Sequence, residues 1–287
     1  MKVVEGIGEV RAAVAAARAA GAGEVGFVPT MGALHAGHYS LIDAAGAGGD
    51  FVVVSIFVNP TQFDSGEDLD RYPRTLAADL AGCAARGVDL VFTPGAEEMY
   101  PSGAATTVHV AGLTDRLCGA SRPGHFDGVC TVVSKLLNIV RPDAAYFGEK
   151  DYQQAAVVRQ MAADLNMPVR IVVGPTVREP DGLAMSSRNA RLSPSERAQA
   201  AALYEALQMG AEMVLDGRGP GEVRGAMRRR LAERAPSGEV DYVEMIDPEG
   251  LERVEEIGDS VLIALAVRFP SARLIDNIRV DLPDAGP

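Results

Sequence analysis

About the first 175 residues alternate between two kinds of segment, and this alternation limits the folds that the chain can adopt. Short apolar runs rich in β-branched and aromatic residues are separated by longer stretches with the apolar spacing of helices. The runs cover 25–29, 51–57, 88–94, 144–148 and 169–174, and the helical stretches include 74–87, 127–140 and 152–165. Strands that alternate with helices form βαβ units. The sequence therefore predicts an α/β fold with a parallel sheet, whose nearly continuous apolar strands are buried on both sides.

The pattern changes after residue 176. Ser193 and Glu196 have the spacing of a capping box, and Pro194 suits the first position of the long helix that should follow. A second helix is predicted over 222–235, and strand-like runs follow at 240–246, 261–268 and 273–280. Helices followed by grouped strands are typical of an α+β domain. We therefore expect one domain over 1–176 and a smaller one over 177–287.

Charge and cysteine content restrict the partners of the chain. It carries 39 acidic and 27 basic residues, for a net charge of −12, which disfavours nucleic acid and anionic membrane surfaces. Its three cysteines show no CxxC spacing and are expected to be reduced thiols that pack rather than react. No apolar run reaches the roughly 18 residues of a membrane span, and the N-terminal segment lacks the features of a signal peptide. The expectation is a cytoplasmic protein without nucleic-acid or membrane partners.

Two of the four histidines lie three residues apart, in the stretch PTMGALHAGHYSLI at 29–42. His35 and His38 follow the first predicted strand, and open α/β sheets bind ligands beyond the carboxyl ends of their strands. A helix beginning near His38 would direct free backbone N–H groups into that crevice, and Gly32 and Gly37 would let a ligand approach the backbone. The stretch predicts an anion site. Ordinary packing is one alternative, and a metal site is another, although Cys, Asp and Glu ligands are missing nearby.

Polar residues also follow two other predicted strands. Asn59 and Gln62 lie in FVNPTQF, where an amide suits a substrate with hydroxyl and carboxylate groups, although Asn-Pro can simply form a turn. Lys150 lies in FGEKDYQQ at a predicted helix start, where the helix dipole disfavours a cation unless an anion is bound. One of Gln153 and Gln154 is expected to face the crevice.

The turn-rich segment 177–192 joins the two predicted domains. It contains two serines followed by Arg188, and hydroxyls beside a guanidinium can bind phosphate, although a capped loop has the same sequence. Arg122 and His125 lie in another turn-rich loop, to which the residues alone assign no role. The collected donors suit a polyphosphate, and no Ser or Cys nucleophile stands beside a base. The sequence therefore suggests ATP-dependent group transfer without a covalent enzyme intermediate. The GxGxxG pattern at 21–26 precedes its strand, so it predicts a turn and not a dinucleotide site.

Five stretches, taken in order, resemble the pantothenate synthetase (pantoate–β-alanine ligase) family. They are PTMGALHAGH, FVNPTQF, RPGHFDGVCTVV, FGEKDYQQ and VREPDGLAMSSRN, and the resemblance runs from about residue 1 to 280. HxGH alone would indicate only the wider HIGH-motif nucleotidyltransferase superfamily. The resemblance implies a Rossmann-like N-terminal domain, a smaller α+β C-terminal domain that closes over the site, and a homodimer.

The same resemblance implies a ligase of pantothenate biosynthesis, in the coenzyme A pathway. It would join (R)-pantoate to β-alanine, with ATP as co-substrate and Mg²⁺, through a pantoyl adenylate, and would release AMP and pyrophosphate. Two other classes stay open: a different nucleotidyltransferase, which keeps the nucleotide in its product, and a catalytically silent nucleotide-binding module.

The resemblance also implies roles for individual residues. His38 takes the position assigned as proton donor, and Gln62 and Gln154 match glutamines that bind pantoate, with Gln62 also assigned to β-alanine. The expected catalytic residues are His35, His38, Lys150 and Arg188. The expected ATP-binding residues are Met31, Gly32, Ala33, Leu34, His35, Ala36, Gly37, His38, Gly148, Glu149, Lys150, Asp151, Val177, Met185, Ser186, Ser187 and Arg188. The family commonly has Glu where this chain has Ala36, a change that removes no phosphate donor, and no metal ligand is assigned.

Overall fold

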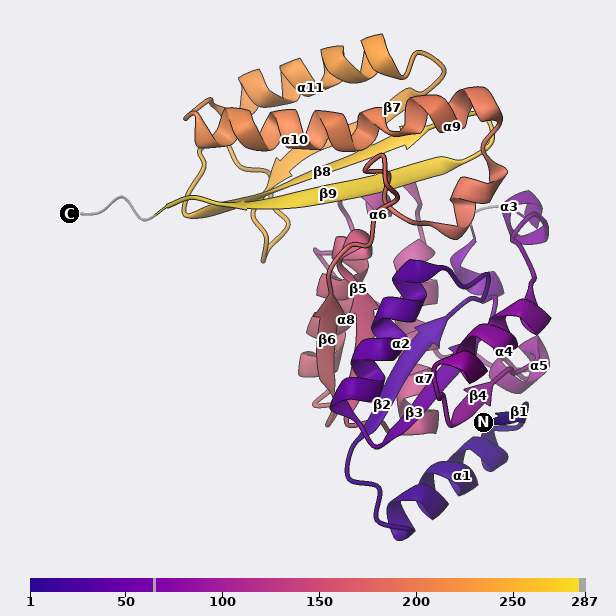
Figure 1. Cartoon of the computed structure of the whole chain (residues 1–287). Helices are drawn as coiled ribbons and strands as arrows, with labels where there is room; N and C mark the ends of the chain where they lie inside the picture. The colour runs from indigo at the N-terminus through magenta and orange to yellow at the C-terminus, as the bar shows by residue number, and fades with distance from the viewer. Residues whose placement is uncertain (64–65, 284–287) are drawn as a thin grey trace. The chain divides into compact units, whose positions relative to one another are not determined.

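Six parallel strands form the sheet of the first unit of the chain, which consists of Met1–Glu149 and Gln153–Thr176 (Figure 1). The computed structural model describes residues 1–63 and 66–283. In spatial order the strands are β1 (Lys2–Val4), β4 (Leu90–Phe92), β3 (Phe51–Ile56), β2 (Val25–Thr30), β5 (Ala144–Gly148) and β6 (Arg170–Gly174). The chain proceeds from β2 outward to β3 and β4, and from β5 outward in the opposite direction, as in Rossmann-like sheets. The five predicted strands are confirmed; β1 was not predicted, because three residues show no periodicity.

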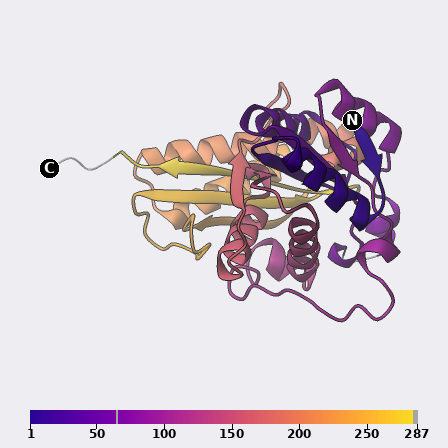
Figure 2. The same ribbon diagram turned by 90° about the horizontal axis from the view of Figure 1, so that it is seen from below.

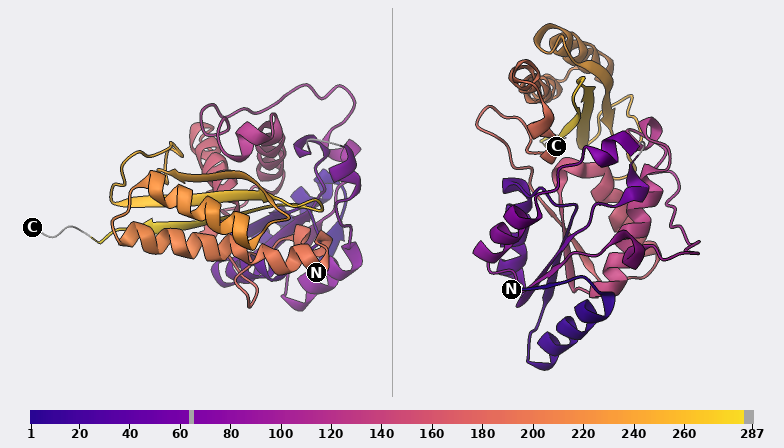
Figure 3. Two further views of the ribbon diagram at one scale, coloured as in Figure 1. Left: turned by 90° about the horizontal axis from the view of Figure 1, so that it is seen from above. Right: turned by 90° about the vertical axis from the view of Figure 1, so that its right-hand side faces the viewer.

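Helices cover both faces of this sheet (Figure 3). The helices and short helical turns of this part of the chain are α1 (Ile7–Ala19), α2 (Ala36–Gly48), η1 (Pro60–Gln62), α3 (Gly66–Asp70), α4 (Leu76–Ala85), α5 (Ala96–Met99), α6 (Cys118–Ser121), α7 (His125–Val140) and α8 (Tyr152–Asp164). The turn η2 (Glu149–Asp151) joins β5 to α8, and Lys150–Tyr152 are assigned to the second unit. The α2 and α4 helices lie on one side of the strands and α7 on the other.

Alternation along the strands explains this two-sided packing. In β3, Val52 and Val54 pack in one core cluster with Leu41 and Ile42 of α2. Val53, which lies between them, is also fully buried but points to the opposite face, since successive side chains of a strand alternate. The nearly continuous apolar runs of the sequence therefore correspond to strands covered on both faces, as predicted.

The second unit consists of Lys150–Tyr152 and the chain from Val177 onward. Its antiparallel sheet has the order β7 (Glu239–Ile246), β8 (Ser260–Arg268) and β9 (Arg273–Asp281). Its helical segments are η3 (Ser187–Arg191), α9 (Pro194–Ala200), α10 (Ala202–Leu215) and α11 (Pro220–Arg234). The α10 and α11 helices lie side by side along this sheet (Figure 2). Apolar residues of both helices and of β8 form the core of the unit.

The start of the helical part of this unit is as predicted, but its continuation is not. Ser193 caps α9 by accepting the N–H of Glu196, whose carboxylate accepts the Ser193 N–H in return. The single long helix expected after this cap is interrupted at Ala201, where the Tyr204 N–H bonds the carbonyl three residues earlier. That tighter bond divides the segment into α9 and α10. Within residues 1–63 and 66–283, none of the helices combines the length and apolarity that crossing a bilayer requires.

Candidate active site

The order of the strands places three polar loops next to one another. The β3, β2 and β5 strands are neighbours, and the chain reverses its direction of travel between β2 and β5. Ligands of open α/β sheets bind beyond the carboxyl ends of the strands at such a reversal. The HxGH stretch follows β2, Gln62 follows β3, and Gly148 ends β5. The structure therefore confirms that the loops selected from the sequence share one edge of the sheet.

The loop between β2 and α2 is held by a buried carboxylate that was not among the residues selected from the sequence. Asp79 of α4 is 2% exposed, and its carboxylate accepts the backbone N–H groups of Ala33 at 2.9 Å and Leu34 at 2.8 Å. Thr75 donates its hydroxyl to the same carboxylate. The loop needs this support because Gly32 and Ala33 both have positive φ, at 83° and 50°, a conformation that Ala adopts at a cost.

The two histidines form a reciprocal cap at the start of α2. His35 is the N-cap and its Nδ1 accepts the Gly37 N–H at 3.2 Å, while the His38 Nδ1 accepts the His35 N–H at 3.3 Å. The ring centroids are 4.1 Å apart. Because Nδ1 accepts a backbone N–H in both rings, these bonds assign the ring proton of each imidazole to Nε2. The pair thus directs its Nδ1 atoms to the backbone of the helix start.

This geometry corrects one expectation about the loop. The helix begins at Ala36, close to the predicted start near His38, but its first turn is not a set of unused N–H groups. The side chain of His35 takes the Gly37 N–H, and Asp79 takes the two N–H groups of the preceding loop. Three backbone N–H groups at this position are therefore already used within the protein.

Asn59 organises the loop that carries Gln62. The Asn59 side chain is 1% exposed; its amide nitrogen donates to the Gln62 Oε1 at 3.0 Å and to the Gly128 carbonyl at 3.1 Å. The Tyr100 hydroxyl donates to its Oδ1 at 2.8 Å. The Gln62 Nε2 lies 3.1 Å from the sulfur of Met31. Asn59 is thus committed to internal bonds, in agreement with its interpretation as a turn residue, and it orients the Gln62 amide.

The loop with Arg122 and His125, whose role the sequence left open, supports the same glutamine. Arg122 donates to the Gln62 carbonyl at 3.0 Å, and the His125 Nδ1 donates to that oxygen at 2.7 Å. A Cβ on Gly128 would lie 2.4 Å from the Thr61 carbonyl oxygen. Only glycine therefore lets α7 approach the loop closely enough for these bonds.

The structure separates the two adjacent glutamines at the start of α8. Gln153 is 6% exposed, its Oε1 accepts the Cys118 N–H, and its amide donates to the carbonyls of Leu113 and Arg116. Gln153 is therefore a structural residue. Gln154 is half-buried, and within residues 1–63 and 66–283 its side chain has no hydrogen-bond partner, so it is the glutamine that can bind a ligand.

In the second unit, Lys150 and the serine–arginine segment have separate supports. The Lys150 ammonium lies 3.5 Å from Asp151, and the Lys150 carbonyl accepts the Asn277 amide at 2.9 Å. The Met185 N–H bonds the Val177 carbonyl, and the Ser186 Oγ accepts the Arg188 N–H. These bonds fix the backbone just before and within the Ser186–Arg188 segment.

A buried ion pair lies beside these residues and was not predicted. Arg178 binds both oxygens of Asp276, at 2.6 and 3.0 Å, and Asp276 is 3% exposed. Burial raises the pKa of Asp276, whereas the Arg178 guanidinium and Lys150 favour its charged form. The next residue, Asn277, donates its side-chain amide to the Lys150 carbonyl. The Arg178–Asp276 ion pair therefore anchors the backbone from which Asn277 supports Lys150.

The thiols and acidic side chains offer little additional chemistry. Burial raises the pKa of Cys83 to about 11 and that of Cys130 to about 12, with nearby carboxylates adding to both shifts. Cys118 is also buried. Protonated, inaccessible thiols are poor nucleophiles. Among the described residues, no three His, Cys, Asp or Glu side chains are grouped as a metal site.

Comparison with known proteins identifies the family. A sequence model described as pantoate-beta-alanine ligase matches residues 2–279. The chain belongs to the pantoate–β-alanine ligase family. It is 53% identical over 285 residues to the pantothenate synthetase of Moorella thermoacetica, covering 99% of this chain and 100% of that protein. It is 55% identical over 261 residues to that of Solidesulfovibrio magneticus, covering 90% and 92% of the two chains.

Solved structures of this family have the same fold. The pantothenate synthetase of Thermus thermophilus matches with a TM-score of 0.93 and 49% identity, over 99% of this chain and 100% of that one. The pantoate–β-alanine ligase of Francisella tularensis, solved with β-γ ATP and β-alanine, matches with a TM-score of 0.81 and 35% identity over 97% of each chain. The resemblance inferred from the five stretches and the predicted fold class are confirmed.

Proposed function

We propose that this protein condenses (R)-pantoate with β-alanine to form pantothenate, with ATP as co-substrate. Family membership over nearly the whole chain supports the reaction, and the ligands of the Francisella relative support ATP and β-alanine. The observation that carries the proposal is the capped histidine pair at the carboxyl end of β2, between the loops that follow β3 and β5. Its two Nε2–H donors suit a phosphate chain.

The reaction proceeds in two steps. A carboxylate oxygen of pantoate attacks the α-phosphorus of ATP, and the bond to the β-phosphate breaks, giving pantoyl adenylate and pyrophosphate. The neutral amine of β-alanine then attacks the acyl carbon; the bond to AMP breaks, and the amine loses a proton. No protein side chain needs to accept an acyl or phosphoryl group, in agreement with the buried thiols. Exclusion of water is important because acyl adenylates hydrolyse.

The histidine pair acts on the phosphates by hydrogen bonding. Since the Nδ1 atoms of His35 and His38 accept backbone N–H groups, each Nε2–H can donate to an oxygen on which charge develops. His38, in the position assigned as proton donor, then needs only to donate a hydrogen bond and does not release its proton. Lys150, Ser186, Ser187 and Arg188 supply further donors and positive charge to the leaving pyrophosphate.

The remaining assignments follow the family pattern. Gln62 and Gln154 bind pantoate, and Gln62 also contacts β-alanine. The ATP site comprises the segments Met31–His38, Gly148–Asp151 and Met185–Arg188, together with Val177. Mg²⁺ enters with ATP and offsets the charge of its phosphates. We further propose a cytoplasmic homodimer of the coenzyme A pathway, in which the C-terminal domain closes over the nucleotide.

Isotope exchange tests the adenylate mechanism directly. With ATP, Mg²⁺ and pantoate but no β-alanine, labelled pyrophosphate should exchange into ATP, and the exchange should stop when pantoate is omitted. Addition of β-alanine should give pantothenate and AMP in equal amounts. Formation of ADP, or exchange without pantoate, would contradict the mechanism. A product that retains the nucleotide would indicate a different nucleotidyltransferase, and complete inactivity of the folded protein would indicate a silent binding module.

A further inference from the structure

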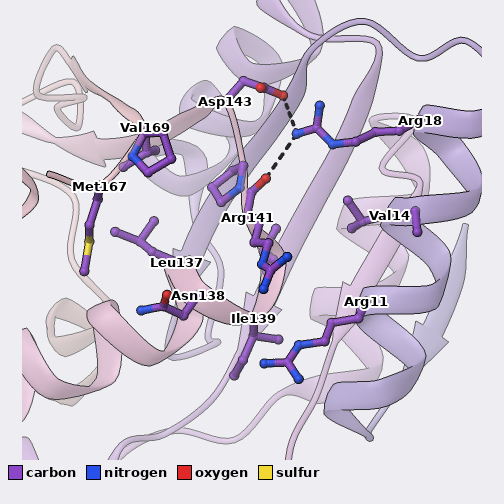
Figure 4. A pocket seen from close by; sticks show the side chains of 14 residues that line it. Arg11, Val14, Arg18, Leu137, Asn138, Ile139, Arg141, Asp143, Met167 and Val169 are labelled. Carbon is purple, nitrogen blue, oxygen red and sulfur yellow. Dashed lines mark hydrogen bonds and ion pairs between the residues drawn. The ribbon is translucent and has the colours of Figure 1, made fainter.

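A cavity opens at the end of the parallel sheet away from the candidate active-site loops. Its volume is about 750 Å³, and it lies between α1, the end of α7 and the turn before β6 (Figure 4). Asp143, which lines it, directly precedes β5, whereas the candidate active-site loops follow the strands. The five residues of β5 separate the two ends of the sheet by about 17 Å, at roughly 3.3 Å per residue. The cavity is therefore not part of the candidate active site.

The lining of this cavity combines an apolar surface with arginines. Val14 of α1 and Leu137 of α7 are both 5% exposed, and Met167 lies on the opposite side of the opening (Figure 4). Arg11, Arg18 and Arg141 contribute three positive charges, against the single carboxylate of Asp143. In a chain with a net charge of −12, this excess of positive charge is local. The volume and the mixed lining are typical of pockets for small organic ligands.

The three arginines differ in what they bind. The Arg18 guanidinium is used within the protein, since it donates to Asp143 at 2.7 Å and to the Arg141 carbonyl at 3.1 Å. Asp143 also accepts the Val25 N–H, so its charge is compensated within the protein. In the described residues, neither Arg11 nor Arg141 has an ion pair or a side-chain hydrogen bond, and both guanidinium groups extend along the cavity (Figure 4). Two solvent-exposed cations therefore line the cavity without a counter-ion in the described residues.

The backbone at Arg141 provides an independent indication. Arg141 ends α7 with φ 52° and ψ 56°, the left-handed conformation in which helices commonly end at glycine. An arginine there adopts a backbone that costs conformational energy, and its side chain forms no bond in the described structure that would offset this cost. Strained positions of this kind frequently mark ligand sites.

We infer that this cavity is a second ligand site, for a small organic anion with an apolar body. The phosphate or carboxylate of the ligand lies between Arg11 and Arg141, which act as paired charge-assisted donors. The apolar part packs on Val14, Leu137 and Met167. The inference concerns binding and does not depend on the proposed catalytic reaction.

Methionine-methyl NMR distinguishes this cavity from the active site, because Met167 lines the cavity and Met31 contacts Gln62. The probes are phenyl phosphate and benzoate, with benzyl alcohol and inorganic phosphate as controls for the apolar and anionic parts. At least one aromatic anion should shift the Met167 signal without shifting Met31, with an affinity at least tenfold above that of either control. The stronger of the two anions identifies the preferred charged group.

Two variants test the arginines. Arg141→Gly removes the guanidinium and leaves a residue suited to the left-handed backbone, so folding should be preserved; Arg11→Gln removes the other cation. Each should weaken binding of the preferred anion about tenfold, and the double variant should abolish the Met167 shift. Arg159→Gln on α8, outside the cavity lining, should have no effect. Binding that survives in the double variant, shifts at Met31 alone, or equal affinity for benzyl alcohol would overturn the inference.

Discussion

The Asp79 carboxylate on α4 accepts the backbone N–H of Leu34, 45 residues earlier in the chain, at 2.8 Å. Together with the bond from Ala33, this contact fixes the loop that leads into the His35–His38 cap. Asp79 does not belong to the stretches that resemble the family, and none of the proposed substrate contacts involves it. It is a positioning residue for the histidine pair.

We expect Asp79→Asn to impair both stability and turnover. The amide keeps the size of the side chain but has one acceptor oxygen, so at least one buried N–H loses its partner, at a cost of about 1–3 kcal/mol. The displaced loop should lower kcat/KM by at least about tenfold, as expected when positioning groups shift. Denaturation curves and steady-state kinetics measure the two effects.

The control for this prediction is Asp43→Asn, since Asp43 is an exposed carboxylate on α2 whose ion pair with Arg86 spans 3.4 Å. It should behave almost as the unchanged protein, because such surface pairs contribute little. Unchanged kinetics in Asp79→Asn would show that the histidine cap holds its geometry without the carboxylate.

The position of the active-site loops could be predicted because it follows from local patterns. Strand–helix alternation places His35, Gln62 and Gly148 at the ends of parallel strands, and parallel strands present those ends at one edge. The supports of these loops could not be predicted in the same way. The bonds from Asp79 to Leu34 and from His125 to the Gln62 carbonyl join residues 45 and 63 positions apart, and no periodicity relates such positions.

Burial in the folded chain also distinguishes residues whose roles could not be separated by their spacing in the sequence. Gln153 and Gln154 are chemically identical neighbours, and only the tertiary fold shows that Gln153 is used by the backbone around α6. A partial signal existed for Asp79: it lies four residues before the buried Cys83 in an Ala-rich helix, on the same helical face. A carboxylate on the apolar face of a helix indicates a buried polar contact, although it does not identify the partner.

The three cysteines should be dispensable for chemistry. Burial raises the pKa of Cys83 and Cys130 to about 11 and 12, so both remain protonated thiols at neutral pH. A triple Cys→Ala variant should lose some stability through packing but retain turnover per folded molecule. Alkylation by iodoacetamide should be slow before unfolding. A loss of activity of about 10³-fold in the folded triple variant, comparable to loss of an oxyanion donor, would reveal an overlooked nucleophile.

Substitution of the residues proposed to bind phosphate should lower kcat. Contacts of His38 and Lys150 are expected to strengthen as charge develops in the transition state. His38→Ala and Lys150→Ala should therefore each lower kcat by roughly 10²–10³-fold. Steady-state kinetics with ATP varied at saturating pantoate measures this. If Lys150→Ala raised only the KM for ATP, Lys150 would bind the ground and transition states equally.

Substitution of the two glutamines should instead weaken the binding of pantoate. Gln62→Ala and Gln154→Ala leave hydroxyl or carboxylate groups of pantoate without a partner, at a cost of about 1–3 kcal/mol each. ATP affinity, measured by calorimetry, should change little. Gln153→Ala is an informative comparison, since the bonds of Gln153 are internal. This variant should lower the free energy of unfolding and leave the KM for pantoate nearly unchanged. Loss of ATP affinity in Gln154→Ala with an unchanged KM for pantoate would contradict the assignment.

Glu196 should make the stability of the protein depend on acid pH. Its carboxylate accepts the Ser271 hydroxyl at 2.6 Å and the backbone N–H groups of Ser271 and Ser193. These bonds, the Ser271 hydroxyl first among them, lower the pKa of Glu196 from 4.5 to about 2. A carboxyl whose pKa is lower in the folded state stabilises the fold fully above its unfolded pKa, and this contribution disappears as pH falls toward the folded value.

Glu196→Gln should therefore be less stable than the unchanged protein at pH 7, and the difference should narrow as the pH falls from about 4.5 toward 2, the window set by these pKa values. The midpoint of thermal unfolding, followed by circular dichroism at several pH values, measures it. Glu233→Gln on α11 is the matched control, because Glu233 is exposed, and its difference from the unchanged protein should stay small throughout. A Glu196→Gln difference that is constant from pH 7 to the acid limit would show that the capping bonds do not depend on the charge of this carboxylate.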